Sequence, residues 1–97
     1  MPTRENILVR IRELKPRIRE RYRVKEVELF GSTIRGEETG SSDIDILVEF
    51  DEGADLFDMT GLAAFLEEEL GRKVDVVPKR ALREELRESI FREAVPI

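Results

Sequence analysis

The eight residues from 43 to 50, DIDILVEF, alternate in a way that is typical of a β-strand with one apolar face. Successive side chains of a strand point to opposite faces of its sheet. The apolar set is Ile44, Ile46, Val48 and Phe50, and the other set is Asp43, Asp45, Leu47 and Glu49. Such a strand has to be covered on its apolar face. We therefore expect a small sheet with helices packed on one face and both aspartates on the uncovered face.

The 97 residues include neither histidine nor cysteine, which excludes several kinds of active site. The chain can build no Ser-His-Asp triad, no Cys-His pair and no ordinary zinc site. Any metal ion would be held by carboxylate oxygens, which favour hard cations such as Mg²⁺ or Mn²⁺. No apolar run approaches the roughly 18 residues of a membrane span, and the N-terminal segment has no apolar signal region. We expect a single cytoplasmic domain over residues 1–97.

The net charge of −5 is distributed unevenly along the chain. Residues 1–25 carry nine Lys or Arg against three acids, residues 26–71 one Arg against fourteen acids, and residues 72–97 seven against five. An acidic centre between basic flanks suits a site that concentrates cations beside a surface for a phosphate-bearing or acidic partner. Solvated faces of amphipathic helices would also explain most of these residues one by one.

Hydrophobic periodicity and turn residues predict the order of the elements. Helices are expected at residues 3–21, 56–70 and 81–93, strands at 24–30, 43–50 and 73–77, and a short edge strand in the apolar tail, 94–97. Pro16 should kink the first helix or begin a second segment, because it cannot donate to the carbonyl of Arg12. The second and third strands, joined through a helix, should be parallel, and the first two can be antiparallel. The fold class is α/β (α+β), with a mixed sheet of three or four strands.

Apolar residues at helical spacing predict which helix faces are buried. The expected core positions are Leu62, Leu66 and Leu70 in one helix and Leu82, Leu86 and Ile90 in the last. Gly71 fits the residue that ends a helix in a left-handed conformation. The run from Glu67 to Glu69 is interpreted as a solvated face.

Asp75 stands alone between the valines of the third strand. If the second and third strands are parallel neighbours, Asp75 can lie beside Asp43 and Asp45 on one face. Three carboxylates together repel one another unless a counter-ion is bound. Two divalent cations about 3.5–4 Å apart would relieve that repulsion, as in two-metal sites for phosphoryl chemistry.

Gly31-Ser32 follows the first strand directly and is expected to open a short helical turn, whose backbone N–H groups suit a phosphate group. Gly31 has no side chain to block a close approach. The Ser32 hydroxyl can donate to a phosphate oxygen, and Arg35 can neutralise developing charge. Antiparallel first and second strands would place Ser32 beside Asp43. A phosphate-binding turn would then lie next to a metal site, and the two together would fit a nucleoside triphosphate.

Each of these features has a simpler explanation when taken alone. Gly-Ser after a strand is usually a turn, and SDID alone is better explained as an Asx-turn with a solvent-facing strand residue. Asp75 alone is unremarkable on an exposed strand face. The conjunction of all three at this spacing, with Arg35-Gly36 in the turn, favours a nucleotide site.

The stretch FGSTIRGEETGSSDIDILVEF, residues 30–50, resembles the signature of the minimal nucleotidyltransferases (MNT) of the DNA polymerase β-like superfamily. That signature is Gly-Ser, ten residues and Asp-x-Asp, with an Arg-Gly pair after the Gly-Ser. The matching residues here are Gly31-Ser32, Arg35-Gly36, Asp43 and Asp45. Asp75, in GRKVDVVP, matches the third carboxylate of the family. The likeness covers nearly the whole chain, and no motif position departs from it.

The resemblance implies a polymerase-β-like palm with Mg²⁺ bound at Asp43, Asp45 and Asp75. It implies two metal ions, and Mn²⁺ can take the place of Mg²⁺. It implies that Gly31 and Ser32, with Arg35 on the same turn, bind ATP, and that AMP passes to a hydroxyl while pyrophosphate leaves. Members such as the MntA-like antitoxins are often paired with a HEPN-domain toxin, and some adenylylate a tyrosine of that toxin.

We expect these 97 residues to leave no room for the second, acceptor-binding domain of larger nucleotidyltransferases. We expect a partner protein to bring the acceptor, docking on the helices or the apolar tail. The leading hypothesis is a Mg²⁺-dependent protein adenylyltransferase antitoxin. One alternative is a non-catalytic antitoxin that occludes its HEPN partner. Another is a nucleotidyltransferase that modifies a small molecule or a nucleic acid with a separate subunit, although the acidic middle disfavours extended nucleic-acid contact.

Overall fold

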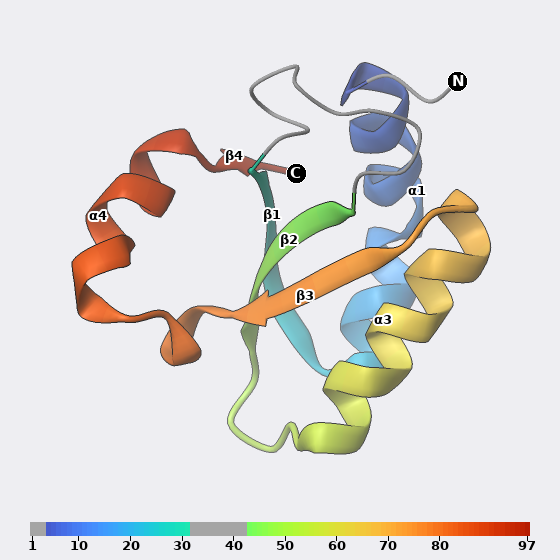
Figure 1. Ribbon diagram of the computed structural model, residues 1–97. Coiled ribbons are helices and arrows are strands. Elements are labelled where there is room, and N and C mark those ends of the chain that lie inside the picture. Colours follow the sequence, from blue (N-terminus) through green and yellow to red (C-terminus); the bar gives the residue numbers. More distant parts are fainter. Residues whose placement is uncertain (1–3, 32–42) are drawn as a thin grey trace.

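The computed structural model describes residues 4–31 and 43–97, and these residues form a mixed sheet with helices (Figure 1). The strands are β1 (Val24–Phe30), β2 (Ile44–Phe50), β3 (Val74–Pro78) and β4 (Val95–Pro96), in the spatial order β3-β2-β1-β4. The helices are α1 (Arg4–Tyr22), α3 (Leu56–Leu70) and α4 (Glu84–Glu93), with a 3₁₀ turn, η1, at Lys79–Ala81. The short helical turn expected after Gly31 lies outside the described residues.

Whether two strands pair parallel or antiparallel follows from the segment that connects them. β2 pairs parallel with β3, and helix α3 forms the crossover between them. β1 pairs antiparallel with β2 and with β4. The predicted parallel and antiparallel pairs, the edge strand in the tail and the fold class are therefore confirmed.

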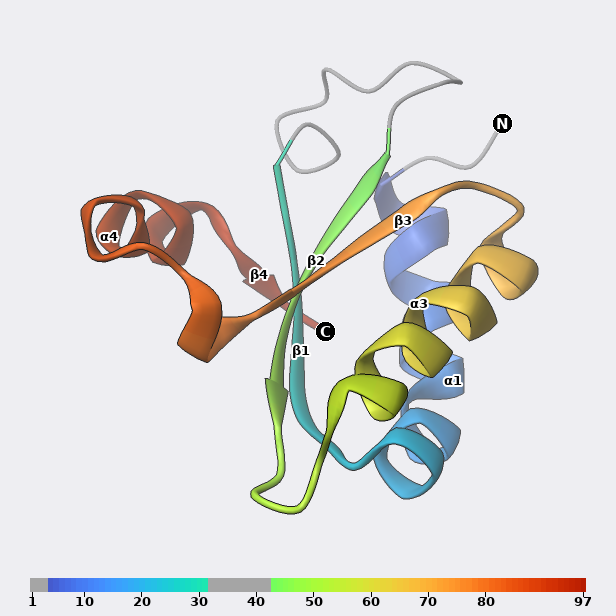
Figure 2. The same cartoon turned by 60° about the horizontal axis from the view of Figure 1, so that its bottom comes forward.

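The main core lies between the sheet and the two helices α1 and α3, which cover one face (Figure 2). Helix α1 contributes an aliphatic stripe at helical spacing, and the alternate residues of β2 meet it. The fully buried residues of this layer include Ile7, Ile11, Ile18, Ile44, Ile46, Val48, Leu62 and Leu66. Burial of this apolar area is the main favourable contribution to folding, at about 25 cal/mol per Å².

Both ends of α3 are fixed by caps that its sequence encodes. The Asp55 side chain accepts a hydrogen bond from the backbone of Asp58 at 3.1 Å, and the Asp58 side chain accepts one from the backbone of Asp55 at 2.9 Å. This reciprocal arrangement is a capping box. At the other end Gly71 has a φ of 66° and closes the helix, as predicted.

Helix α1 continues through Pro16 as one helix, so no second segment begins there. A proline inside a helix removes one hydrogen bond, and the buried stripe on either side of Pro16 keeps the helix on the sheet. In the described part of the chain, no helix combines the length and the apolar character needed to cross a membrane.

The prediction that Leu82, Leu86 and Ile90 belong to the core is wrong. Helix α4 begins only at Glu84, has no buried residue and lies on the side of the sheet away from α1 and α3 (Figure 2). Leu86 is 49% exposed. The physical reason is that α1 and α3 already close the main core, so the apolar stripe of α4 finds no place in it.

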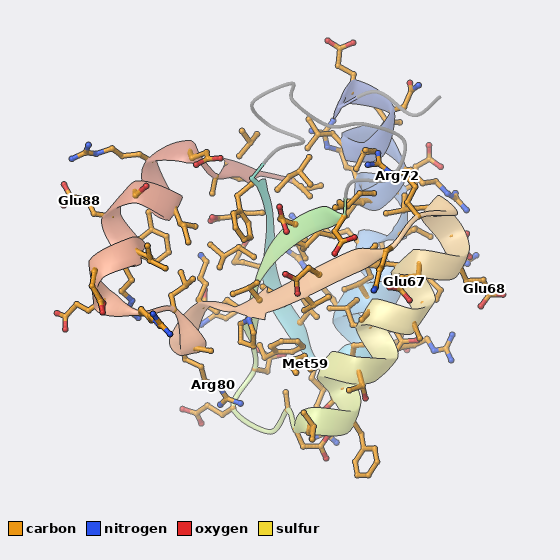
Figure 3. The ribbon with its side chains drawn as sticks, in the orientation of Figure 1. Met59, Glu67, Glu68, Arg72, Arg80 and Glu88 are labelled. Atoms are coloured by element: carbon orange, nitrogen blue, oxygen red, sulfur yellow. The ribbon has the colours of Figure 1, made fainter. Side chains whose placement is uncertain are left out.

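The interpretation of residues 67–69 as a solvated face is also wrong for two of the three. Glu67 accepts a hydrogen bond from the backbone N–H of Val74 at 3.0 Å and thereby connects α3 to the start of β3. Glu69 forms an ion pair with Arg10 of α1. Only Glu68 is exposed, and it points away from the molecule (Figure 3).

The different burial of α3 and α4 predicts different mutational costs. Leu66→Ala should lower the free energy of unfolding by about 2–5 kcal/mol, because it leaves a cavity in the main core. Leu86→Ala should lower it by less than about 1 kcal/mol, since that side chain is half exposed. Guanidinium unfolding followed by circular dichroism measures both values. Equal costs would contradict the placement of α4 outside the core.

Candidate active site

Asp45 and Asp75 are direct partners in the parallel ladder between β2 and β3. On the other side of Asp45 the partner is Phe30, the last residue of β1. Paired residues on neighbouring strands are about 4.7–4.9 Å apart and point to the same face. Because Ile44 and Ile46 point into the main core, both carboxylates lie on the face opposite α1 and α3. The structure therefore brings Asp45 and Asp75 together.

Asp43 lies just before β2 and is exposed. The next residue, Ile44, donates its backbone N–H to the carbonyl of Lys73 at 2.9 Å, which places Asp43 near the start of β3. Within residues 4–31 and 43–97, no three carboxylates form a group close enough to hold a metal ion. The protein by itself thus presents an adjacent pair, Asp45 and Asp75, and a third carboxylate at the open end of the strand.

The backbone of Gly31 lies directly against the carboxylate of Asp45. Gly31 is buried and has a φ of 79°, in the left-handed region that other residues rarely adopt. A Cβ atom at this position would lie 2.1 Å from Oδ2 of Asp45. Glycine is therefore required both by its own backbone and by the aspartate beside it.

A further carboxylate, Glu93, reaches the same place from the end of α4. Its Oε1 atom accepts a hydrogen bond from the backbone N–H of Gly31 at 3.1 Å. The pairing of Val95 with Leu29 in the sheet brings this part of the chain back to the end of β1. The sequence analysis missed Glu93, because nothing in the pattern of α4 distinguishes it from the other acidic residues of that helix.

Three of the motif residues, Ser32, Arg35 and Gly36, lie outside the described residues. Their proximity to Asp43 and Asp45 stays a prediction.

The face that carries Asp45 and Asp75 is not fully uncovered, contrary to expectation. Leu47, two residues after Asp45 on the same face, is fully buried. In the same row of the sheet its β1 partner is Glu28, which pairs with Lys79 of η1 at 3.1 Å. Lys79 also lies 4.0 Å from Glu49. The turn after β3 therefore covers one end of this face, and the aspartates lie toward the other end.

The donor set suits a hard divalent cation bound together with a phosphate-bearing ligand. Mg²⁺ commonly takes one or two protein carboxylates and completes its shell with water and substrate phosphates. Asp45 and Asp75 provide such a pair, and the absence of a side chain at Gly31 lets the carboxylate of Asp45 lie directly against the backbone there. An ion held here would lie close to the backbone of Gly31.

Several known proteins resemble this chain. Residues 11–97 match the family model described as a nucleotidyltransferase domain. The "Protein adenylyltransferase MntA" of Thermococcus cleftensis is 42% identical over 81 residues, which are 84% of this chain and 82% of the relative. A solved structure assigned as a minimal nucleotidyltransferase superimposes with a TM-score of 0.85 at 41% identity, over 98% of this chain and 96% of the other.

More distant structures share the fold. A toxin–antitoxin structure with AMP-PNP has a TM-score of 0.71 at 24% identity, over 87% of this chain and 69% of the other. A structure of a tri-AMPylated HEPN toxin of Shewanella oneidensis in complex with an MNT antitoxin has a TM-score of 0.66 at 21% identity, over 93% of this chain and 70% of the other. From the family match and the close relatives, it follows that this chain belongs to the nucleotidyltransferase domain family and is a nucleotidyltransferase.

Proposed function

We propose that this chain is a Mg²⁺-dependent protein adenylyltransferase, which transfers AMP from ATP to a hydroxyl group of a HEPN-domain partner and acts as the antitoxin of that pair. The observation that carries the proposal is the pairing of Asp45 with Asp75 directly beside the bare backbone of Gly31. The adenylyltransferase name of the Thermococcus relative and the HEPN complexes with the same fold support the reaction and the class of acceptor.

The triphosphate is assigned to the turn that follows β1. Because Gly31 already donates its N–H to Glu93, its contribution is to let the carboxylate of Asp45 lie against the start of this turn. Ser32 and Arg35, which follow in the sequence, are assigned to the phosphate oxygens, the first as a hydroxyl donor and the second as a charge-assisted donor. Glu93 would then act as a positioning residue, which holds the start of the turn.

The metal is assigned to Asp43, Asp45 and Asp75 together with phosphate oxygens of the bound nucleotide. When bound, Mg²⁺ or Mn²⁺ stabilises the negative charge that develops on those oxygens. The acceptor oxygen attacks the α-phosphorus, the bond from that phosphorus to the bridging oxygen of the β-phosphate breaks, and pyrophosphate leaves. Asp75 is exposed, so it can orient the acceptor hydroxyl and take its proton.

The double change Asp43→Asn and Asp45→Asn should reduce AMP transfer to the HEPN partner by at least about 100-fold, since it removes the charges that bind the cation. Transfer is measured with labelled ATP and Mg²⁺. Asp51→Asn with Glu52→Gln is the matched control, because it neutralises two exposed acids just beyond β2. Transfer that survives in the first variant would contradict the proposal. Neutralisation of the toxin that survives without transfer would favour the occlusion alternative.

Gly31→Ala should weaken binding of AMP-PNP with Mg²⁺ at least about tenfold, because the new methyl group would displace the carboxylate of Asp45. Gly71→Ala is the control. It imposes a similar left-handed strain of about 1–2 kcal/mol, with a φ of 66°, but its Cβ would meet nothing within 4 Å. Calorimetric titration of the folded variants measures both affinities. Equal affinities would show that the approach of Gly31 to Asp45 has no part in nucleotide binding.

A further inference from the structure

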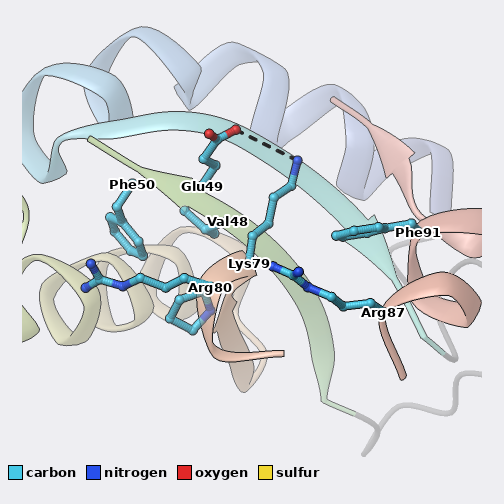
Figure 4. Close-up of a pocket in the computed structure, with 8 residues that line it drawn as sticks. Val48, Glu49, Phe50, Lys79, Arg80, Arg87 and Phe91 are labelled. Carbon is cyan, nitrogen blue, oxygen red and sulfur yellow. Dashed lines mark ion pairs between the residues drawn. The ribbon is translucent and has the colours of Figure 1, made fainter. Parts of the chain in front are cut away.

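A pocket of about 350 Å³ lies between the ends of β2 and β3 on one side and α4 on the other (Figure 4). Its charged lining residues are Glu49, Lys79, Arg80 and Arg87, and Phe91 lies beside them. Three cations therefore face one carboxylate, in a chain whose net charge is −5. We call this the α4 pocket.

The cations of the α4 pocket differ in how they are paired. Lys79 lies 3.1 Å from Glu28 and 4.0 Å from Glu49, so its charge is compensated within the protein. Among the described residues, neither Arg80 nor Arg87 has an ion pair with a carboxylate. Figure 4 shows Lys79 between them, with the Arg80 guanidinium near Phe50 and the Arg87 side chain pointing from α4 toward Lys79. Two guanidinium groups thus remain available to an anion from outside the molecule.

Apolar surface accompanies these charges. Phe91 is 45% exposed and lies under the ammonium of Lys79, 5.9 Å from the ring centre, while Leu86 is 49% exposed. Arginine and aromatic side chains in a pocket are the residues that most often dominate the binding energy of protein interfaces. Helix α4 therefore combines the charge and the apolar area of a protein-binding surface.

The α4 pocket lies on the same sheet face as the two aspartates. Glu49 is four residues after Asp45 on β2, which corresponds to about 13 Å along the strand. An extended segment of a bound protein covers about 3.3–3.6 Å per residue. Such a segment could place one side chain in the pocket and another, about four residues away, at Asp75.

We propose that the α4 pocket binds an acidic side chain of the acceptor protein, about four residues from the hydroxyl that receives AMP. This rests on the proposed function, because it names how the partner of that reaction is recognised. The carboxylate accepts charge-assisted hydrogen bonds from Arg80 and Arg87, and the neighbouring apolar atoms pack on Phe91. The pocket thus contributes to recognition of the acceptor protein.

The test compares two double variants by calorimetric titration with the HEPN-domain partner protein. Arg80→Ala with Arg87→Ala should weaken partner binding about tenfold or more, because it removes both charged donors. Arg83→Ala with Arg92→Ala removes the same charge from the start and end of α4, outside the pocket lining, and should change the affinity less than about twofold. Binding of AMP-PNP to the chain alone should be the same in all three proteins.

Four outcomes would overturn the proposal: no binding of the partner by the unaltered chain, equal losses in the two double variants, no loss in either, or an equal loss of AMP-PNP affinity. The last would make the pocket a nucleotide site.

A single-stranded RNA oligomer tests the other source of anions. If the unaltered chain binds the RNA, and the pocket variant loses that binding but keeps its affinity for the partner, the guanidinium groups bind nucleic-acid phosphates. If the unaltered chain binds the partner but transfers no AMP, the proposed function fails and the pocket is still tested.

A photo-crosslinking side chain in place of Phe91 tests the spacing. The crosslinked partner peptide should contain an acidic residue about four positions from the adenylylated hydroxyl. A crosslink to a segment without acidic residues, or far from the modified residue, would contradict the proposal.

Discussion

The structure depends on the two unlike faces of β2, which lies between β1 and β3 in the sheet. Its aliphatic face is fully buried by α1 and α3, and that burial fixes the register in which Asp45 points the other way. A shift of one residue would bury the carboxylate and expose the aliphatic residues, so the register is strongly specified. The hydrophobic core therefore determines where the charged groups of the site stand.

The neighbouring strands complete this arrangement from both sides. β3 places Asp75 beside Asp45, and β1 ends at Gly31, whose backbone lies against the same carboxylate. Glu93 then connects the end of α4 to the Gly31 N–H. Three other parts of the chain, the end of β1, β3 and the end of α4, thus meet at the site of Asp45.

Much of this could be predicted from local sequence patterns. Alternation identified β2 and its two faces, and the short connections identified the parallel and antiparallel pairs. Gly71 was identified as the residue that ends α3, as helix-end chemistry requires. These features depend on residues close together in the sequence, or on connections that allow only one arrangement.

The features that were missed depend on contacts between distant segments. The apolar spacing of Leu86 shows that one face of α4 is suited to burial, but it does not say that α1 and α3 already close the core. The hydrogen bond of Glu93 and the ion pair of Glu28 with Lys79 link residues 62 and 51 positions apart. No spacing rule identifies such pairs. The exposed apolar face of α4 was thus mistaken for core. This face lies beside the α4 pocket, which we propose to be a binding surface for the acceptor protein.

We propose that this nucleotidyltransferase modifies a protein with AMP through its paired carboxylates. Intact-mass measurement of the HEPN partner, after incubation with this chain, ATP and Mg²⁺, tests it most directly. We expect a mass increase of one or more adenylyl groups on hydroxyl side chains, with release of pyrophosphate, and no increase with Asp75→Asn. A partner that stays unmodified with the unaltered chain, under Mg²⁺ and Mn²⁺ alike, would contradict it.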